Sequence, residues 1–185
     1  MENEVMNVIL SRRSIRSYTE EPVTAAEIQV LKDAALAAPS AMNRQPWHFT
    51  FCANKALLQK INEAGQAQAS AESADKRGRY VDPNYDVFYK APLVIFVSAE
   101  PDGFFTMLDC GIATQNIVLA AESLGLGSVI LGLPRFAFQS PCGDELRAAL
   151  HFPAGQDFAI AIAIGHAAAT KDAHEIKPNR VDDVL

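Results

Sequence analysis

The chain has 185 residues, enough for one domain with a sizeable core, and its 49% hydrophobic and 21% charged residues are typical of a folded protein. The formal net charge of −6 argues against general nucleic-acid binding, because that activity requires a basic face. The three cysteines are scattered without a CxxC pair, which argues against a metal centre. No apolar run reaches about 18 residues, which argues against a membrane span. The first residues, MENEV, lack the positive charge of a signal region, which argues against secretion. A cytoplasmic protein is therefore expected.

Two helices are predicted before residue 40. Residues 3–12 carry an apolar stripe behind Asn3, a residue type that caps helices. Residues 24–27, TAAE, match a capping box, and the helix that begins there is expected to run to about Ala38, because Pro39 cannot continue it. Four of its side chains are expected to face inward: Ile28, Leu31, Ala35 and Leu36.

The middle of the chain alternates between regular and irregular sequence. Residues 48–53 alternate as a strand does, and a helix is predicted over 54–64. Residues 65–90 combine Gly, Ser, Asp, Lys and Arg with scattered tyrosines and little periodicity. We interpret them as an insert over a site, partly helical near 68–77. An apolar strand is predicted over 93–99.

The second half predicts a long helix over 105–124, which Gly125 and Gly127 are expected to end. A strand over 128–132 and a short helix over 143–150 follow.

The last predicted strand covers residues 158–165, FAIAIAIG. Phe158 and the three isoleucines are expected on one face and the alanines on the other. Neither face is polar, so helices should cover both faces of a central sheet, and α+β is the expected class. From Ala167 onward the chain is polar and is expected to extend over a surface.

Three guanidiniums lie within five residues of an acidic protein, in the segment SRRSIRSY. Arg12, Arg13 and Arg16, with Ser14, suit an anion such as phosphate, because arginine presents a planar fork of donors. The alternative is a set of solvated cations at a helix end, which the habits of helix termini favour.

The connector PSAMNRQPW, residues 39–47, is the second candidate. Its prolines stiffen the backbone and hold it away from helix, so Ser40, Asn43 and Gln45 could present fixed donors and acceptors to the edge of a flat heterocycle. An ordinary turn whose polar side chains bind neighbouring backbone groups is an equal alternative.

Two further patterns carry weaker signals. The run LGLGSVILGLP places its glycines between a helix and a strand, the reverse of the dinucleotide-binding order, although Gly132 would permit close approach of a planar ligand. In the tail, Lys177 and Arg180 could close on a phosphate, or simply be solvated.

The remaining candidates for metal binding or nucleophilic catalysis are weak. The four histidines lack the spacing of metal ligands, and the sequence shows no Ser-His-Asp set. Cys110 lies among apolar residues, as a core residue would.

Four pieces of the sequence together resemble the FMN-dependent nitroreductase-like family. They are SRRSIRSY, PSAMNRQPW, DCGIATQNIVLAAESLGLGSVILG and the tail sequence KPNR, in this order and spacing, so the resemblance spans essentially the whole chain. It implies a single nitroreductase-like domain over 1–185, with a central, mainly antiparallel sheet covered by helices on both faces. It implies as well that the insert 65–90 shapes a substrate pocket. It also implies a domain-swapped homodimer that holds FMN at the interface, with 167–185 wrapped on the partner subunit. The resemblance favours the ligand-binding interpretation of both polar segments.

The resemblance also implies residue roles. Arg12, Arg13 and Ser14 would hold the phosphate and ribityl end, and Arg16 would lie near the pyrimidine edge and stabilise the reduced flavin, without a protein nucleophile. The connector would reach the partner's flavin, and Lys177 and Arg180 would return to the phosphate. Many relatives carry a glutamate where this chain has Leu131, so contacts there would be through the backbone. The implied cofactor-binding residues are Arg12, Arg13, Ser14, Arg16, Pro39, Ser40, Ala41, Asn43, Gln45, Ile130, Leu131, Gly132, Lys177 and Arg180.

The activity implied by the resemblance is an FMN-dependent oxidoreductase. Hydride would pass from NAD(P)H through flavin N5 to an electron-poor acceptor, such as a nitroaromatic, quinone or activated alkene, in a ping-pong cycle. Three alternatives stay open: dehydrogenation or reductive dehalogenation on the same fold, flavin storage or regulation without turnover, and a binding domain without flavin.

Overall fold

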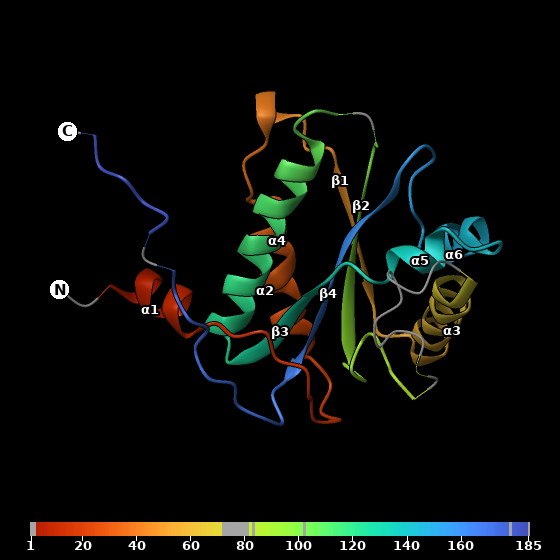
Figure 1. Cartoon of the computed structure of the whole chain (residues 1–185), viewed down its shortest axis with the longest axis horizontal. Helices are drawn as coiled ribbons and strands as arrows, with labels where there is room; N and C mark the ends of the chain where they lie inside the picture. The colour runs from red at the N-terminus through yellow and green to blue at the C-terminus, as the bar shows by residue number, and fades with distance from the viewer. Residues whose placement is uncertain (1–2, 72–81, 83, 102, 178, 185) are drawn as a thin grey trace.

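The computed structural model of the chain describes residues 3–71, 82, 84–101, 103–177 and 179–184 (Figure 1). Within them a four-stranded sheet carries helices on both faces, which confirms the predicted α+β class. No helix in these ranges is long and apolar enough to cross a membrane. The elements in chain order are α1 (Glu4–Ser11), α2 (Ala25–Leu36), η1 (Ala41–Asn43), β1 (Trp47–Cys52), α3 (Lys55–Ala71), β2 (Leu93–Ala99), α4 (Thr106–Ser123), β3 (Leu126–Leu131), α5 (Arg135–Phe138), α6 (Gly143–Ala149) and β4 (Asp157–His166).

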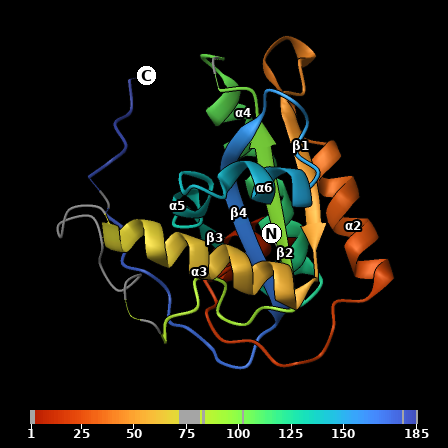
Figure 2. The same ribbon diagram turned by 90° about the vertical axis from the view of Figure 1, so that its right-hand side faces the viewer.

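The strands lie in the order β1-β2-β4-β3, and every neighbouring pair is antiparallel. Helices α2 and α4 cover one face, and α3, α5 and α6 cover the other (Figure 2). All seven residues of the inner strand β2 are buried, as a sequence that is apolar except for Ser98 predicts. The sheet therefore separates two hydrophobic clusters and leaves β3 at an edge.

Strand β4 confirms the predicted alternation except at its start. Ile162 and Ile164 belong to the cluster under α2 and α4, and Ala161 and Ala163 belong to the opposite cluster. The prediction for Phe158 is wrong, because its ring stacks on Phe138 on the alanine side at a centroid distance of 4.9 Å. A register shift between β2 and β4 adds one residue there, and such a bulge reverses the facing of everything beyond it.

The predicted helices are present, with two corrections. The capping box forms as expected, since Glu27 N–H donates to the Thr24 hydroxyl at 3.3 Å while the Glu27 carboxylate accepts from Thr24 N–H at 2.7 Å. Leu36, predicted to face inward, is 62% exposed in the last turn of α2. Residues 65–71, assigned to the insert, continue α3 instead, with buried small residues. The helical prediction near 68–77 is confirmed up to Ala71 and lies outside the described residues beyond it.

The two glycines near the junction of α4 and β3 have different roles. Gly125 has a φ of +75°, which suits the left-handed position after a helix, so this part of the prediction is confirmed. Gly127 does not end the helix, because β3 already begins at Leu126. The short helix α5 was not predicted, since four residues carry no periodic signal.

Candidate functional site

The polar segment after α1 is attached to the open edge of the sheet. Ile15 donates its backbone N–H to the carbonyl of Ser128 on the edge strand β3 at 2.9 Å. A Cβ added to Gly127 would come within 2.9 Å of the Ile15 side chain, and one added to Gly165 within 3.1 Å of the Tyr18 ring. These two glycines therefore let the segment lie directly against β3 and β4.

Tyr18 holds the far end of this segment. Burial raises the pKa of its hydroxyl above the ordinary value, so the group stays protonated at neutral pH. It lies 2.8 Å from the Ile15 carbonyl and 3.2 Å from the Ala163 carbonyl, to either of which it can donate its proton. Tyr18 thus ties the arginine segment to the centre of β4.

Arg13 binds the end of its own helix. Its Nη1 donates to the carbonyls of Leu10, Ser11 and Arg12 at 2.6, 2.9 and 3.0 Å. Carbonyls at the carboxyl end of a helix lack partners within the helix, so this arginine acts as a cap. The helix-end interpretation therefore applies to Nη1 of Arg13, whereas Nη2 and Nε form no hydrogen bond with any described residue and could meet another acceptor.

The other polar groups of the segment are less committed. Arg12 and Ser14 are half-buried, and neither side chain has a hydrogen-bond partner within the described part of the chain. Arg16 is exposed, its Nη1 donates to the Ser14 carbonyl at 3.3 Å, and its guanidinium carbon lies 5.9 Å from the centre of the Tyr89 ring. The segment therefore offers a cluster of positive charge and unused donors beside β3.

The far end of β3 leaves open space on the same strand that carries this cluster. Ile130 is 42% exposed, whereas the side chain of Leu131 is buried in the core, so Leu131 can offer only its backbone to a ligand. Gly132 has no positive φ, and a Cβ added there would meet nothing nearer than Ile160 Cδ1 at 4.0 Å. The packing of the chain does not require this glycine. At the rise of a strand, Gly132 lies about 13 Å beyond Ser128, so the open edge could accommodate an extended ligand.

The connector between α2 and β1 has a strained backbone. Met42, Asn43 and Gln45 have φ values of 51°, 54° and 47°, in the left-handed region that side chains rarely adopt. Gln45 donates its backbone N–H to the Ser40 hydroxyl at 2.9 Å and its side-chain amide N–H to the side-chain oxygen Oδ1 of Asn43 at 2.9 Å. Strain of this kind persists only where surrounding contacts fix the conformation, and it concentrates at functional sites.

Asp109 braces this connector, and the sequence did not reveal it. The residue lies in the first turn of α4, is 4% exposed, and accepts the backbone N–H of Ala41 at 3.1 Å. The positive end of the helix dipole favours a carboxylate at this position. The one signal available was an acidic residue in the first turn of a largely apolar helix. The contact itself spans 68 residues.

The two polar segments do not meet within one chain. The connector contacts the beginning of α4 through Asp109, and the arginine segment contacts β3, which follows the end of α4 (Figure 1). Helix α4 has 18 residues and is therefore about 27 Å long. A single small ligand could not contact both segments of the same molecule.

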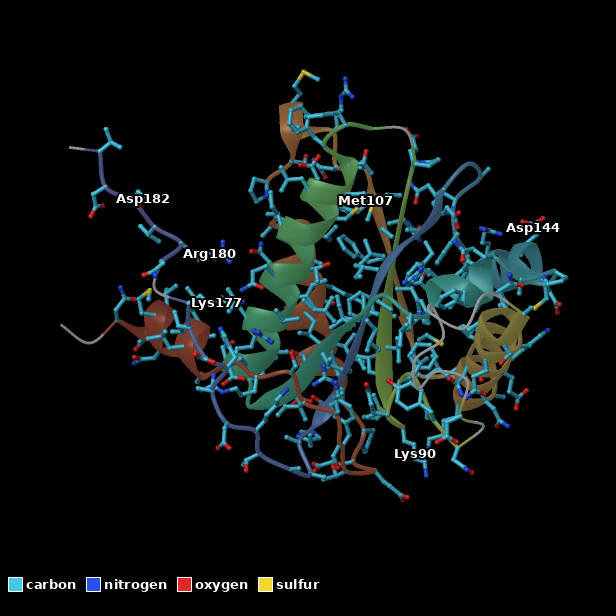
Figure 3. All side chains as sticks on the ribbon, in the orientation of Figure 1. Lys90, Met107, Asp144, Lys177, Arg180 and Asp182 are labelled. Atoms are coloured by element: carbon cyan, nitrogen blue, oxygen red, sulfur yellow. The ribbon has the colours of Figure 1, made fainter. Side chains whose placement is uncertain are left out.

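Lys177 and Arg180 lie on the tail after β4 (Figure 3). The tail begins in contact with the arginine segment, because Ala168 N–H donates to the Ser17 carbonyl at 3.0 Å. Farther on it is exposed and ends clear of the sheet and of α4. In the described residues neither cation is hydrogen-bonded to the segment 12–16, so the structure of one chain does not bring these cations to the arginines.

A cavity of about 450 Å³ lies near Tyr18, between the first turns of α3 and the turn before β2. Leu58 and Phe88 belong to its apolar lining, and Lys55, Glu20 and Lys90 carry charges around it. Its volume is within the range that small-molecule sites occupy.

The buried thiols are not nucleophiles at neutral pH. Burial, assisted by the neighbouring Asp109, raises the pKa of Cys110 to about 11, and burial also raises the pKa of Cys52. The described residues contain no group of three His, Cys, Asp or Glu side chains that could hold a metal ion.

Fold and site together define a class: an α+β protein with a cationic segment on the open edge of an antiparallel sheet. The model of the Nitroreductase family matches residues 9–166. A crystal structure of a nitroreductase with bound FMN from Desulfitobacterium hafniense superimposes on this chain with a TM-score of 0.93. The two sequences are 34% identical, and the alignment covers 100% of each chain.

Two archaeal proteins, both provisionally named NADH dehydrogenase/NAD(P)H nitroreductase, are also similar. The protein of Archaeoglobus fulgidus is 33% identical over 186 residues, which cover 96% of each chain. The protein of Methanothermobacter thermautotrophicus is 38% identical over 134 residues, a stretch that makes up 70% of this chain and 61% of that one. The chain belongs to the Nitroreductase family.

Proposed function

We propose that the chain binds FMN at the interface of a homodimer and transfers electrons from NAD(P)H to a small electron-poor acceptor. Nitroaromatics, quinones and activated alkenes are the acceptor classes we expect. The observation that carries the proposal is the set of unused donors of Arg12 and Ser14 beside the open end of β3. The similar D. hafniense structure contains FMN, and the two archaeal relatives carry NAD(P)H in their names.

The residues of the arginine segment and of β3 fit FMN chemically. Guanidinium and hydroxyl donors suit a phosphate, and we assign Arg12, Ser14 and the free part of the Arg13 fork to it. Exposed Ile130 and the open space beside Gly132 suit a planar, apolar ring. Lys177 and Arg180 would close over the phosphate if the tail changes its course on assembly.

Bound FMN would supply a hydride acceptor at ring nitrogen N5. Arg16 would place a positive charge at the pyrimidine edge of the ring, where negative charge develops on reduction. Ile130 would exclude water from one side of the ring. Donor and acceptor would have to occupy the remaining open side in turn, which is the basis for expecting ping-pong kinetics.

A second subunit is needed because the two polar segments lie at opposite ends of α4. We propose that the strained connector of one subunit, with Pro39, Ser40, Ala41, Asn43 and Gln45, completes the site formed by the arginine segment of the other. Exposed apolar side chains on α1 and the beginning of α4 support an interface over these elements (Figure 3). They include Val5, Phe104, Met107 and Leu108.

The cavity next to Tyr18 is the place we assign to acceptor selection. It is lined by Tyr85, Asp86, Phe88 and Lys90, which belong to the segment 65–90 that the sequence suggested as a pocket insert. Its apolar lining with charged residues around it suits a small aromatic acceptor with a polar substituent.

The first experiment is an absorption spectrum of the purified protein before and after anaerobic NADH or NADPH, with the molar mass measured by light scattering. We expect flavin bands that bleach with a nicotinamide, a molar mass twice that of the chain, and steady NAD(P)H consumption with menadione or a nitrofuran. Protein that stays colourless when FMN is added would contradict the proposal. Bound flavin that no nicotinamide reduces would indicate storage or regulation in its place.

A further inference from the structure

The turn before β2 is built with unusual backbone strain. Tyr89 and Lys90 have φ values of 55° and 58°, and a bulky residue in the left-handed region is an outlier. A turn that only connected a loop to a strand could use glycine at both positions at no steric cost. The strain therefore calls for a reason other than connection.

Several side chains hold this turn in its strained form. Both carboxylate oxygens of Asp86 are used, one accepting Phe88 N–H at 2.8 Å and the other Lys90 N–H at 3.1 Å. From α3, Asn62 accepts Val87 N–H at 3.0 Å. Gln66, one turn further along α3, donates to the Tyr85 carbonyl at 2.7 Å.

What this rigid turn presents is the ring of Tyr89. Its hydroxyl shares a hydrogen bond of 2.6 Å with the hydroxyl of Tyr85, and the two rings meet edge to face with centroids 5.7 Å apart. The Arg16 guanidinium carbon lies 5.9 Å from the centre of the Tyr89 ring. The ring is thus fixed on one side by Tyr85 and packs against an otherwise exposed arginine on the other.

We infer that Tyr89 is the positioning residue for Arg16, and that it holds the guanidinium where it can act on the pyrimidine edge of FMN. The inference rests on the proposed function. An exposed arginine on a flexible stem samples many rotamers, and the face of an aromatic ring attracts a cation and restricts it. A charge fixed before the reaction stabilises developing charge better than one that must be reoriented.

A matched pair of variants tests the inference. Tyr89→Leu removes the ring but keeps a non-glycine residue at the same φ, and Tyr89→Phe keeps the ring and loses only the hydroxyl. We expect Tyr89→Leu to lower the rate of anaerobic flavin reduction by about two- to fivefold, the range of an exposed cation–π contact. The two-electron reduction potential of bound FMN, measured against a reference dye, should fall by about 10 to 20 mV. This is the same two- to fivefold factor, converted at about 30 mV per tenfold change.

Tyr89→Phe should restore both quantities to within about twofold of the parent, because the ring face carries the attraction. Flavin-loaded Tyr89→Leu with an unchanged potential would overturn the inference and leave the proposed function intact. If the reduction potential falls equally in Tyr89→Leu and Tyr89→Phe, the inference is also overturned, because the hydroxyl and not the ring would then be responsible for the change. If the parent protein binds no FMN, both the inference and the proposed function fail.

Discussion

The arginine segment and the connector are both polar and irregular, yet different forces hold them in place. The arginine segment is fixed by backbone pairing to β3 and by two glycines that allow Ile15 and Tyr18 to approach the sheet. Residues 40–46 of the connector have no strand partner in the described structure. They have three left-handed residues, hydrogen bonds within the loop, and bonds from outside it to the buried Asp109 and to Gln156. One segment is part of the sheet edge, and the other is a strained loop at the beginning of a helix.

This difference indicates how each segment should respond to substitution. A segment held by close packing is displaced when a methyl group is added where none fits, and the stability of the whole fold should fall. A strained loop held by few hydrogen bonds loses its conformation when one bond is removed, and the change should stay local. Substitutions in the arginine segment should therefore affect stability most, and substitutions in the connector should affect ligand binding most.

The largest effect is expected from Gly165→Ala. The new Cβ would lie 2.5 Å from Pro92 Cδ and 3.1 Å from the Tyr18 ring, and neither ring can rotate away freely. We expect the free energy of unfolding of the FMN-free protein to fall by about 3 kcal/mol, at the upper end for overpacking. Urea denaturation at fixed protein concentration measures this change.

The matched control for this variant is Gly132→Ala, which adds the same methyl group where the nearest atom is 4.0 Å away. Its stability should be within about 0.5 kcal/mol of the parent, as for substitutions away from packed features, while its affinity for FMN should fall, because the methyl group would occupy the space we assign to the ring. Equal stabilities for the two alanine variants would show that close packing does not hold the arginine segment.

A smaller effect on stability, with a clear effect on binding, is expected from Asp109→Ala. Ala41 N–H would lose its partner, at a cost of about 1–2 kcal/mol, and the connector would lose its brace. Asp109→Asn keeps an oxygen that can accept the same bond, so FMN affinity measured by titration should be lost in the alanine variant and largely recovered in the asparagine variant. Equal affinities in Asp109→Ala and the parent would mean that the connector does not need the brace or does not reach the flavin.

The sequence predicted those elements whose signal lies within a few residues of chain. The capping box at Thr24 and the apolar run of β2 depend on neighbours, and both are present as predicted. The continuity of α3 through residues 65–67 was missed because its glutamines and small residues carry no apolar period, although Gly65 is buried by tertiary packing. The facing of Phe158 was wrong because a bulge depends on pairing with β2.

The same limit applies to the candidate site. The arginines and the connector were visible as unusual local composition, and the roles proposed for them come from the family resemblance. Asp109 was not visible, because its role comes from a contact with Ala41 that spans 68 residues. Tyr89 was not visible either, because a stack on Arg16 requires the strained turn to be known.

The smallest effect is expected from Met42→Gly, which tests whether strain in the connector serves binding. Met42 is 77% exposed with a φ of 51°, so glycine would relieve the backbone, and its own entropy cost would offset part of the gain. We expect a net stabilisation of about 0.5 kcal/mol. His151→Gly, at an exposed residue with a φ of 56° outside both polar segments, should stabilise to the same degree. Only Met42→Gly should weaken FMN binding, by about two- to threefold, because a freed connector must be ordered again on binding. Calorimetric titration of both variants measures this difference, and equal affinities would show that the strained backbone serves some other purpose than holding the ligand.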